Sequence, residues 1–429
     1  MTDLFDLFYS CSSVCTDTRN IFPDSLFIAL KGSNFNGNEF AEEAITKGAK
    51  FAIVDEKNFA NSKQIYYVEN SLIFLQNLAL YHRRKFNIPV IGITGTNGKT
   101  STKELCAAVL KQKFNVLFTE GNLNNHIGVP LTILKLTKKH DLAIIEMGAN
   151  KKGDIKELAE IAEPTHGIIT NIGQAHLEGF GSISKILHTK KELYDFLEIN
   201  KGVIFINAED PILVSITPKN TALIKYGRKA EGSNIKGEII EIKPEIYFNL
   251  ETSGHIEKIK SNLIGEYNFT NMLASASIGD YFGISTADIK IGIESYVPKN
   301  NRSQIKRTNN NVLILDAYNA NPTSVNVAID SFIQMTHESK FFILGDMLEL
   351  GTESITFHQS IVDKCISNNL EGIFIGKNYK NCSNNTNSFY FFEQKDEASI
   401  YLKKVKLQGR LILLKGSRGI GLESLEILL

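Results

Sequence analysis

Short apolar runs rich in valine and isoleucine recur along the chain, each followed by glycine or polar residues and then by a longer helix-like stretch. Runs that are apolar at every position are typical of parallel strands covered by helices on both faces. Alternation of such strands with helices indicates an α/β fold. The clearest predicted strands lie within residues 89–96, 142–149, 167–173, 202–210, 312–320, 341–347, 372–377 and 411–417.

Two interruptions divide this pattern. The stretch HRRKFNIP (82–89) ends a first region in which residues 17–56 follow a strand–loop–helix–strand pattern, and proline and polar residues break the periodicity again at 297–303. Between about 215 and 262 the sequence turns polar with short alternating stretches, which predicts strands on an edge or flap. We therefore expect three α/β domains, at residues 1–87, 88–298 and 299–429: a small N-terminal one, a central one with a mostly parallel sheet, and a Rossmann-like C-terminal one.

Composition excludes several classes of protein. The 429 residues include 47 Lys+Arg and 47 Asp+Glu, whereas a nucleic-acid binder that releases counterions normally has a basic excess. No apolar run approaches the ~18 residues that span a bilayer, and the acidic N-terminus lacks the basic and apolar regions of a signal peptide. Five sparse cysteines without a C-x-x-C pair argue against a disulfide scaffold or zinc knuckle. We expect a cytoplasmic protein with no transmembrane segment and no nucleic-acid partner.

The strongest chemical signal is the glycine-rich sequence TGTNGKT at 94–100, directly after a predicted strand and before a predicted helix. Such a turn points backbone N–H groups at a phosphate, and the helix N-terminus adds partial positive charge. Lys99 would reach the β- and γ-phosphates, and the Thr100 hydroxyl would ligate Mg²⁺. The strict G-x-x-x-x-G-K-[ST] pattern is not met, because Ile93 occupies the first glycine position. The alternative is a glycine-rich turn with a solvent-exposed lysine.

Weaker candidates also follow predicted strands, where ligands bind in open α/β sheets. Glu146, after LAIIE, can hold a magnesium ion, although such a residue can equally cap a helix or be solvated. His176, in NIGQAHLEG, is as often a structural residue as a ligand. Lys190 would by default be a solvated helix lysine, and the residues alone do not favour it over Lys191.

Asparagine is dense in GNLNNHIGVP (121–130) and in DAYNANPTS (316–324). Carboxamides offer donors and acceptors in one plane, which suits sugars, peptides and nucleobase edges, but asparagine also favours turns. For an isolated asparagine a turn is the better interpretation. Two such clusters after strands shift the balance toward ligand recognition.

Together these motifs resemble the Mur ligase family, the ATP-dependent amide ligases of peptidoglycan precursor synthesis. The resemblance spans essentially the whole chain in the family's order of three domains, and TGTNGKT is similar to the family's phosphate loop, which accounts for the missing first glycine. GNLNNHIGVPLTIL, EMGANKKGDI, NIGQAHLEGFGS, DAYNANPTS, GDMLELG and KGSRG are most similar to the member that adds D-alanyl-D-alanine. Relatives that add other stem residues, or glutamate to folate, differ at the DAYNANP and GNLNN positions.

The resemblance implies the reaction. The terminal carboxylate of UDP-N-acetylmuramoyl-tripeptide would attack the γ-phosphate of ATP, and the amine of D-alanyl-D-alanine would then attack the acyl phosphate. It implies two Mg²⁺ ions, a carbamylated Lys190, a central phosphate-loop ATPase domain, an N-terminal domain that binds the UDP-sugar, and a C-terminal domain that closes on ATP and binds the dipeptide. We expect a monomer. The pattern HTKKELYD departs from the commoner Lys-Gly-Glu at Lys191, so Lys190 is favoured by register.

The resemblance also assigns residues to roles. The catalytic residues would be Lys99, Glu146, His176 and Lys190, and the metal ligands Thr100, Glu146, His176 and Lys190. ATP would be bound by Gly95, Thr96, Asn97, Gly98, Lys99, Thr100, Ser101, Asn268, Asn271, Arg302 and Asp316. The peptide and sugar substrates would contact Thr18, Arg19, Lys31, Asn36, Asn124, Asn125, Asn319, Asn321, Lys415, Ser417 and Arg418, although the loop of the last three could equally contact nucleotide.

Three alternatives stay open at this point. One is a related amide ligase with a different amino-acid acceptor. Another is a phosphate-loop switch or regulatory ATPase, which would have no use for His176, Lys190 or the asparagine clusters. The third is an inactive scaffold. Against it argue five intact residues: Lys99, Thr100, Glu146, His176 and Lys190.

Overall fold

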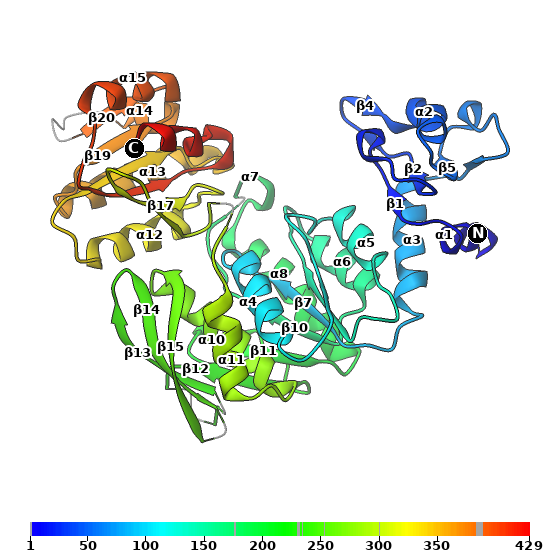
Figure 1. Cartoon of the computed structure of the whole chain (residues 1–429), viewed down its shortest axis with the longest axis horizontal. Coiled ribbons are helices and arrows are strands. Elements are labelled where there is room, and N and C mark those ends of the chain that lie inside the picture. Colours follow the sequence, from blue (N-terminus) through cyan, green and yellow to red (C-terminus); the bar gives the residue numbers. More distant parts are fainter. Residues whose placement is uncertain are drawn as a thin grey trace.

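The computed structural model of the chain describes residues 2–175, 177–229, 232–233, 235–252, 254–299, 301–382 and 389–429. Sheets of four, nine and six strands follow one another along the chain, and a two-stranded hairpin accompanies the first. Figure 1 shows the first and third sheets at the two upper corners and the central sheet beneath them. The predicted α/β fold is confirmed. Over these ranges, no helix is both long and apolar enough to cross a membrane.

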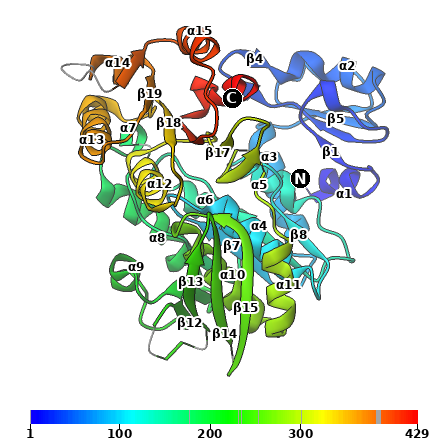
Figure 2. The same ribbon diagram turned by 60° about the vertical axis from the view of Figure 1, so that its left-hand side comes forward.

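The first sheet is parallel throughout, in the order β1-β2-β5-β6. The elements of this region are α1 (Thr2–Tyr9), β1 (Val14–Cys15), β2 (Leu26–Ile28), β3 (Lys31–Gly32), β4 (Phe35–Asn36), α2 (Ala41–Thr46), β5 (Phe51–Val54), β6 (Ile65–Tyr67) and α3 (Ser71–Arg83). Helix α3 begins at Asn70, whose side chain accepts a hydrogen bond from the Ile73 N–H. Its apolar face, with Leu75 and Leu78, belongs to a hydrophobic core that continues to Ile145 of the central sheet. The α3 helix therefore joins the first sheet to the central one, as both views show (Figures 1 and 2).

The central sheet has the order β15-β14-β13-β12-β11-β10-β7-β9-β8, and its strands from β8 to β13 pair in parallel. Its strands are β7 (Val90–Thr94), β8 (Val116–Phe118), β9 (Leu142–Glu146), β10 (His166–Ile169), β11 (Val203–Asn207), β12 (Ala222–Gly227), β13 (Ile235–Ile242), β14 (Glu245–Thr252) and β15 (His255–Ile264). Its helices are α4 (Lys99–Leu110), α5 (Gly128–Ile133), α6 (Asp154–Ala162), α7 (Leu177–Phe180), α8 (Ile183–Ile199), α9 (Pro211–Ser215), α10 (Tyr267–Tyr281) and α11 (Thr286–Ser295). The polar stretch between 215 and 262 forms β12 to β15 at one edge, as predicted, with β14 antiparallel to both neighbours.

The third sheet has the order β16-β17-β21-β18-β19-β20 and is parallel except for the edge strand β16. Its elements are β16 (Gln304–Arg307), β17 (Val312–Asp316), α12 (Pro322–Gln334), β18 (Lys340–Gly345), α13 (Ser354–Ser367), β19 (Gly372–Ile375), α14 (Lys377–Asn381), β20 (Phe389–Phe392), α15 (Lys395–Val405) and β21 (Leu411–Lys415). Separate apolar clusters cover its two faces. Strands β17, β18, β19 and β21 are buried almost throughout, which explains their apolar sequences.

The candidate site lies at the carboxyl ends of parallel strands in the central and third sheets. Strands β7, β9, β10 and β11 are parallel neighbours, so the polar residues that follow them meet at one edge of the central sheet. Strands β17 and β21 are also parallel neighbours, which brings together the residues that follow Asp316 and Lys415. These two edges meet in one cavity.

Candidate active site

The turn between β7 and α4 has the backbone of a phosphate-binding loop. Gly95 and Gly98 have φ angles of +140° and +80°, which residues with a Cβ atom rarely adopt. A Cβ atom on Gly95 would meet the Thr170 hydroxyl at 2.0 Å, and one on Gly98 would meet the Asn271 carboxamide at 2.8 Å. Gly98 is also the N-cap residue of α4, so the loop and the helix N-terminus present N–H groups to an anion.

The Lys99 ammonium folds back over this loop. Its Nζ donates hydrogen bonds to the carbonyl oxygens of Gly95 at 2.8 Å and Thr96 at 3.0 Å. Burial lowers the pKa of Lys99, the Glu146 carboxylate opposes this shift, and the Arg302 cation adds to it. Charged phosphate oxygens are stronger acceptors than carbonyl oxygens. A nucleotide in the loop would therefore take over these donors.

Glu146, the last residue of β9, lies beside Thr100. The Thr100 hydroxyl donates to the carboxylate oxygens of Glu146, at 3.1 and 2.9 Å, and the Asn124 carboxamide donates to Oε1 at 2.8 Å. The Glu146 residue is only 1% exposed. It is therefore neither a solvated residue nor a helix cap.

Lys103 is a residue that the sequence analysis missed. It is fully buried on α4, its Nζ lies 3.9 Å from Glu146 Oε2, and it donates to the carbonyl oxygen of Thr119 at 2.6 Å. The available signal was its position four residues after Lys99, which places the two lysines on one face of the helix. Lys103 also pairs with Glu104 at 2.8 Å, and it adds positive charge near the buried Glu146 carboxylate.

The donors around Glu146 fit Mg²⁺. A hydroxyl and a carboxylate are hard oxygen ligands, and Mg²⁺ is usually bound by one or two protein groups together with phosphate oxygens and water. Within the part of the chain that the structure describes, no group of three or more His, Cys, Asp or Glu side chains is placed to hold a metal. A metal at Thr100 and Glu146 would therefore depend on the phosphates of a nucleotide.

The residues after β10 support the phosphate loop and were also missed. The Thr170 hydroxyl donates to the Asn97 carbonyl oxygen at 2.6 Å, and the Asn171 carboxamide bonds both the N–H and the carbonyl of Asn97 at 3.0 Å. Thr170 and Asn171 belong to the sequence TNIG, which directly follows a predicted strand. This position at a strand end is the signal that could have identified them as site residues. His176, in the same segment, lies outside the described residues.

Asn268 and Asn271 lie on α10 beneath the phosphate loop. Asn271 donates to the Asn268 carboxamide oxygen at 3.0 Å and accepts from the Thr102 hydroxyl at 3.1 Å. Asn268 in turn donates to the carbonyl oxygen of Ile264 at 2.8 Å. Both carboxamides are thus engaged within the protein, and they fix α10 against the start of α4.

Lys190 on α8 lines the same cavity as the phosphate loop. It is 3% exposed, and over the described ranges its ammonium has no hydrogen bond or ion pair, only the Phe180 ring at 5.9 Å. Burial lowers the pKa of Lys190 well below its ordinary value, and the Lys99 cation lowers it further. Lys191 instead forms a partly exposed ion pair with Asp195. The two lysines that the residues alone could not separate thus have different surroundings.

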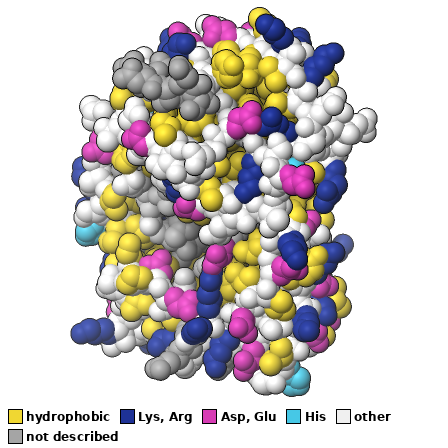
Figure 3. Space-filling model, turned by 90° about the vertical axis from the view of Figure 1, so that its left-hand side faces the viewer, with side chains coloured by type: hydrophobic (Ala, Val, Ile, Leu, Met, Phe, Trp, Pro, Cys, Tyr) yellow, Lys and Arg dark blue, Asp and Glu magenta, His cyan; other side chains and the backbone are white. Residues whose placement is uncertain are grey.

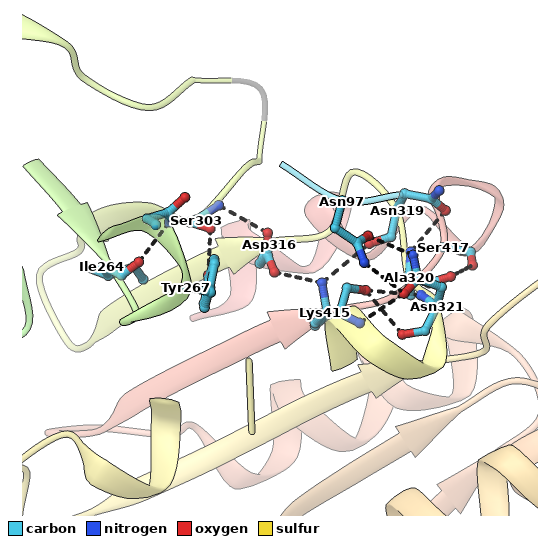
Figure 4. A network of polar contacts seen from close by, with 12 residues as sticks. Asn97, Ile264, Tyr267, Ser303, Asp316, Asn319, Ala320, Asn321, Lys415 and Ser417 are labelled. Atoms are coloured by element: carbon cyan, nitrogen blue, oxygen red, sulfur yellow. Dashed lines mark hydrogen bonds and ion pairs between the residues drawn. The ribbon is translucent and has the colours of Figure 1, made fainter. Parts of the chain in front are cut away.

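A polar network joins the central and third sheets (Figure 4). The Asn97 and Asn321 carboxamides pair across the boundary, with the shorter bond at 2.8 Å. The carboxylate of Asp316 accepts from the buried Lys415 ammonium at 2.6 Å and from the Ser303 N–H at 3.1 Å. The phosphate loop is therefore in direct contact with the start of α12.

Ser417 and Asn319 belong to the same edge of the third sheet. The buried Ser417 hydroxyl accepts from the Leu348 N–H at 2.9 Å, and the Asn319 carboxamide oxygen accepts from the Ala320 N–H at 2.9 Å. Arg418 is exposed at the rim.

A cavity of about 630 Å³ contains most of the predicted site. It is lined by Gly95, Thr96, Asn97, Gly98, Lys99, Thr100, Ser101, Asn124, Asn125, Glu146, Lys190, Asn268, Asn271, Arg302, Asp316, Asn319, Asn321 and Lys415. Ser417 and Arg418 are not among its lining residues but border a smaller cavity beside Asn319 and Asn321. A phosphate loop, a buried carboxylate and a buried amine thus face one cavity.

The four predicted first-domain residues do not line this cavity. Arg19 pairs with Asp17 at 2.6 Å. Lys31 pairs with Asp55 and Glu56, each at 3.0 Å, and Asn36 donates to Glu56 at 3.1 Å. Thr18 accepts from Lys47 through its backbone carbonyl at 3.1 Å. Thr18 and Arg19 lie in the turn after β1, and Lys31 and Asn36 lie in the β3–β4 hairpin.

Comparison with known proteins agrees with this geometry. Residues 11–96 match the Mur ligase family catalytic domain, residues 93–279 the Mur ligase middle domain, and residues 301–418 the Mur ligase glutamate ligase domain. The chain is 36% identical over 428 residues to UDP-N-acetylmuramoyl-tripeptide–D-alanyl-D-alanine ligase of Buchnera aphidicola subsp. Baizongia pistaciae, covering 98% of this chain and 92% of the relative.

Solved structures give the same result. The structure of MurF from Acinetobacter baumannii matches with a TM-score of 0.90 at 28% identity, covering 99% of this chain and 97% of the other. That of MurF ligase from Thermotoga maritima in complex with ADP matches with a TM-score of 0.87 at 26% identity, over 99% and 97% of the two chains.

Proposed function

The chain belongs to the Mur ligase family, and on that premise we propose that it joins D-alanyl-D-alanine to UDP-N-acetylmuramoyl-tripeptide, with conversion of ATP to ADP and phosphate. The product is a peptidoglycan precursor, so the activity would serve cell-wall growth and, through it, cell shape and division. The enzyme would act as a cytoplasmic monomer.

One observation carries the proposal. The phosphate loop with Lys99, the Thr100–Glu146 pair and the buried Lys190 amine face a single cavity that the third sheet completes. A regulatory switch needs only the first of these features. A ligase must bring a nucleotide and a second anionic substrate together, and a cavity lined by all three suits that task.

In the first step, a carboxylate oxygen of the tripeptide attacks the γ-phosphorus of ATP. An O–P bond forms, the bond between the γ-phosphorus and the β,γ-bridging oxygen breaks, and ADP leaves. The two reactants are anions, so the main task of the protein is positioning and charge neutralisation. Lys99, the loop N–H groups and Arg302 would offset the charge of the phosphates, and Thr96 and Asn97 would shape the loop around them.

Magnesium ions would supply further charge neutralisation when bound with the nucleotide. Thr100 and Glu146 would hold one ion, and Ser101 would assist. His176 and Lys190 would support the second.

Lys190 would take part as a carbamate. Its neutral amine would attack CO₂, forming a C–N bond and releasing one proton, so that a neutral side chain becomes an anionic one. The buried position, the lowered pKa and the neighbouring Lys99 cation all favour the neutral amine that this reaction requires. An anion at this position would also pair with Lys99.

In the second step, the free amine of D-alanyl-D-alanine attacks the carbonyl carbon of the acyl phosphate. The tetrahedral intermediate collapses, the C–O bond to phosphate breaks, and the amine loses its proton. Asn319 and Arg418 would contact the peptides. Asn321, Lys415 and Ser417 bond the protein itself, and we assign them to holding these loops.

The three sheets would correspond to domains at residues 1–87, 88–298 and 299–429. Thr18, Arg19, Lys31 and Asn36 would bind the UDP-sugar on the first domain, with Asn124 and Asn125 nearer the reacting carboxylate. The first-domain residues lie outside the cavity. A single substrate would therefore have to reach from the first domain to the cavity, and a nucleotide sugar that carries a peptide is long enough to do so.

Phosphate release tests the proposed function directly. The purified chain is incubated with ATP, Mg²⁺ and UDP-N-acetylmuramoyl-tripeptide. Addition of D-alanyl-D-alanine should raise the rate of phosphate release about tenfold or more, because the acyl phosphate otherwise lacks an amine to react with. Release that ignores the dipeptide would contradict a ligase and favour the regulatory ATPase. Release that requires a single amino acid instead would indicate a related ligase with another acceptor.

A further inference from the structure

The segment that carries Arg302 is held in an unusual backbone conformation. Asn301 and Ser303, on either side of it, have φ angles of +56° and +51°, in the left-handed region that residues other than glycine seldom occupy. Such strain persists only where surrounding contacts impose it, and it is concentrated at functional sites. The conformation turns the intervening Arg302 into the space between the central and third sheets, where it lines the cavity.

Contacts from both sides impose this conformation. The Tyr318 N–H donates to the Asn301 carbonyl oxygen at 3.2 Å, and the Ser303 N–H donates to Asp316 Oδ1 at 3.1 Å. The Ser303 hydroxyl bonds the Tyr267 hydroxyl of α10 at 2.7 Å (Figure 4). The backbone around Arg302 is thus fixed by the loop that follows β17 and by the helix beneath the phosphate loop.

The side chain of Arg302 is held in a different way. Its guanidinium carbon lies 3.5 Å from the centroid of the Tyr318 ring, and the Arg418 guanidinium carbon lies 5.4 Å from the same centroid. Over the ranges that the structure describes, the Arg302 guanidinium forms no hydrogen bond and no ion pair. A guanidinium stacked on a ring is fixed by its face, so its five N–H donors along the edge stay available.

We propose that Tyr318 is a positioning residue that holds the Arg302 guanidinium in place to bind the phosphates of ATP. The proposal rests on the proposed function, because that function identifies the phosphates of ATP as the anion that Arg302 would bind. Arg302 and the residues of the phosphate loop line the same cavity. An arginine fixed by stacking loses little side-chain entropy when the phosphates bind, and its donors do not first have to leave another partner.

This role was not evident in the sequence. Tyr318 lies between Asp316 and Asn319 in DAYNANP, and both neighbours are polar residues of the types that suit ligand contact. The tyrosine acts through its ring, and Arg302 lies sixteen positions before it in the chain. Only the turn at residues 301–303 brings the two side chains together.

The test is a double-mutant cycle with the full chain. The probe is Mg²⁺ with the non-hydrolysable ATP analogue adenylyl imidodiphosphate, and its affinity is measured by titration calorimetry. Tyr318→Leu removes the ring while keeping an apolar side chain, and we expect it to weaken binding about five- to tenfold, the range of a desolvated cation–π contact. Tyr318→Phe keeps the ring and should retain affinity within about twofold.

The cycle with Arg302 decides between positioning and direct contact. In an Arg302→Met background, Tyr318→Leu should change the affinity by less than about twofold, because the residue it positions is gone. A loss that is equally large in both backgrounds would overturn the proposal and indicate that the ring contacts the nucleotide itself. An unchanged affinity of the Tyr318→Leu single variant would overturn it as well.

Two controls separate this proposal from the proposed function. Tyr390→Leu removes an exposed tyrosine of β20, at the edge of the third sheet, where it packs on Tyr401. This variant should leave the affinity unchanged. Failure of the unaltered chain to bind the analogue would contradict the ligase function. Binding by the unaltered chain with additive effects in the cycle would contradict only the role of Tyr318.

Discussion

Replacing Lys99 with methionine is expected to reduce kcat by roughly 10³-fold, the effect of removing a principal charge-stabilising group from a phosphoryl-transfer site. The Lys99 ammonium lies inside the phosphate loop, where it bonds the carbonyl oxygens of Gly95 and Thr96. Methionine has a similar length but no charge, so the loop keeps its shape while the γ-phosphate loses its cation. The measurement is dipeptide-dependent phosphate release at saturating ATP.

A lysine on the same helix provides the matched control. Lys111, at the end of α4, is exposed and lies over the Phe118 ring, and Lys111→Met should leave kcat unchanged. The thermal midpoint of Lys99→Met should stay close to that of the unaltered chain. The loss of two hydrogen bonds destabilises the fold, but the removal of a desolvated cation offsets this loss. A folded Lys99→Met variant with nearly full turnover would mean that this loop does not bind the reacting phosphate.

Replacing Lys190 with alanine is expected to abolish turnover almost completely, a loss of about 10²-fold or more, with partial rescue by a short-chain carboxylate such as acetate. The reason is that the proposed carbamate supplies an anion beside Lys99, and a free carboxylate can occupy the space that the shortened side chain leaves. Removal of dissolved CO₂ should slow the unaltered enzyme for the same reason.

The neighbouring lysine tests whether the position was assigned correctly. Lys191 pairs with Asp195 on the partly exposed face of α8, so Lys191→Ala should retain most of the activity. Loss of activity in Lys191→Ala with full turnover in Lys190→Ala would show that the carbamate belongs to the other lysine. Loss in Lys190→Ala without any carboxylate rescue would argue for a structural cation in place of the carbamate. A carbamate signal in the NMR spectrum with labelled CO₂ would provide independent support.

Most of the fold could be predicted because buried parallel strands leave a strong pattern. The runs around Val90, Leu142, Val203 and Leu411 are apolar up to their last residue, and each forms a largely buried strand. The edge of the sheet at which ligands bind followed from the same pattern, since parallel strands end together. The phosphate loop was recognisable because its glycines meet a backbone requirement that other residues satisfy poorly.

Side-chain contacts between distant segments could not be predicted in this way. Asn124 lies in the loop after β8, and the sequence did not indicate that its carboxamide donates to Glu146 at the end of β9. Lys103 looked like an ordinary helix lysine, and only its packing places it beside the same carboxylate. Neighbouring positions on a helix point about 100° apart, and the residues alone did not show that the packing of α8 buries Lys190 and leaves Lys191 partly exposed. Tertiary contacts decide these cases, and a single sequence does not contain them.

The zero net charge remains consistent with two anionic substrates. Figure 3 shows basic and acidic side chains interspersed on the face it draws. The positive groups that matter are local: Lys99, Arg302 and the N-terminus of α4 line one cavity. Neutrality therefore argued against a nucleic-acid polymer and not against phosphate.

The fate of the carboxylate oxygens tests the central claim most directly. The tripeptide is prepared with a heavy oxygen isotope in both oxygens of its terminal carboxylate and is incubated with ATP, Mg²⁺ and D-alanyl-D-alanine. Our account predicts that mass spectrometry will find the pentapeptide product with one heavy oxygen retained, and inorganic phosphate with the other. Unlabelled phosphate, or phosphate formed without the pentapeptide product, would contradict ligation through an acyl phosphate.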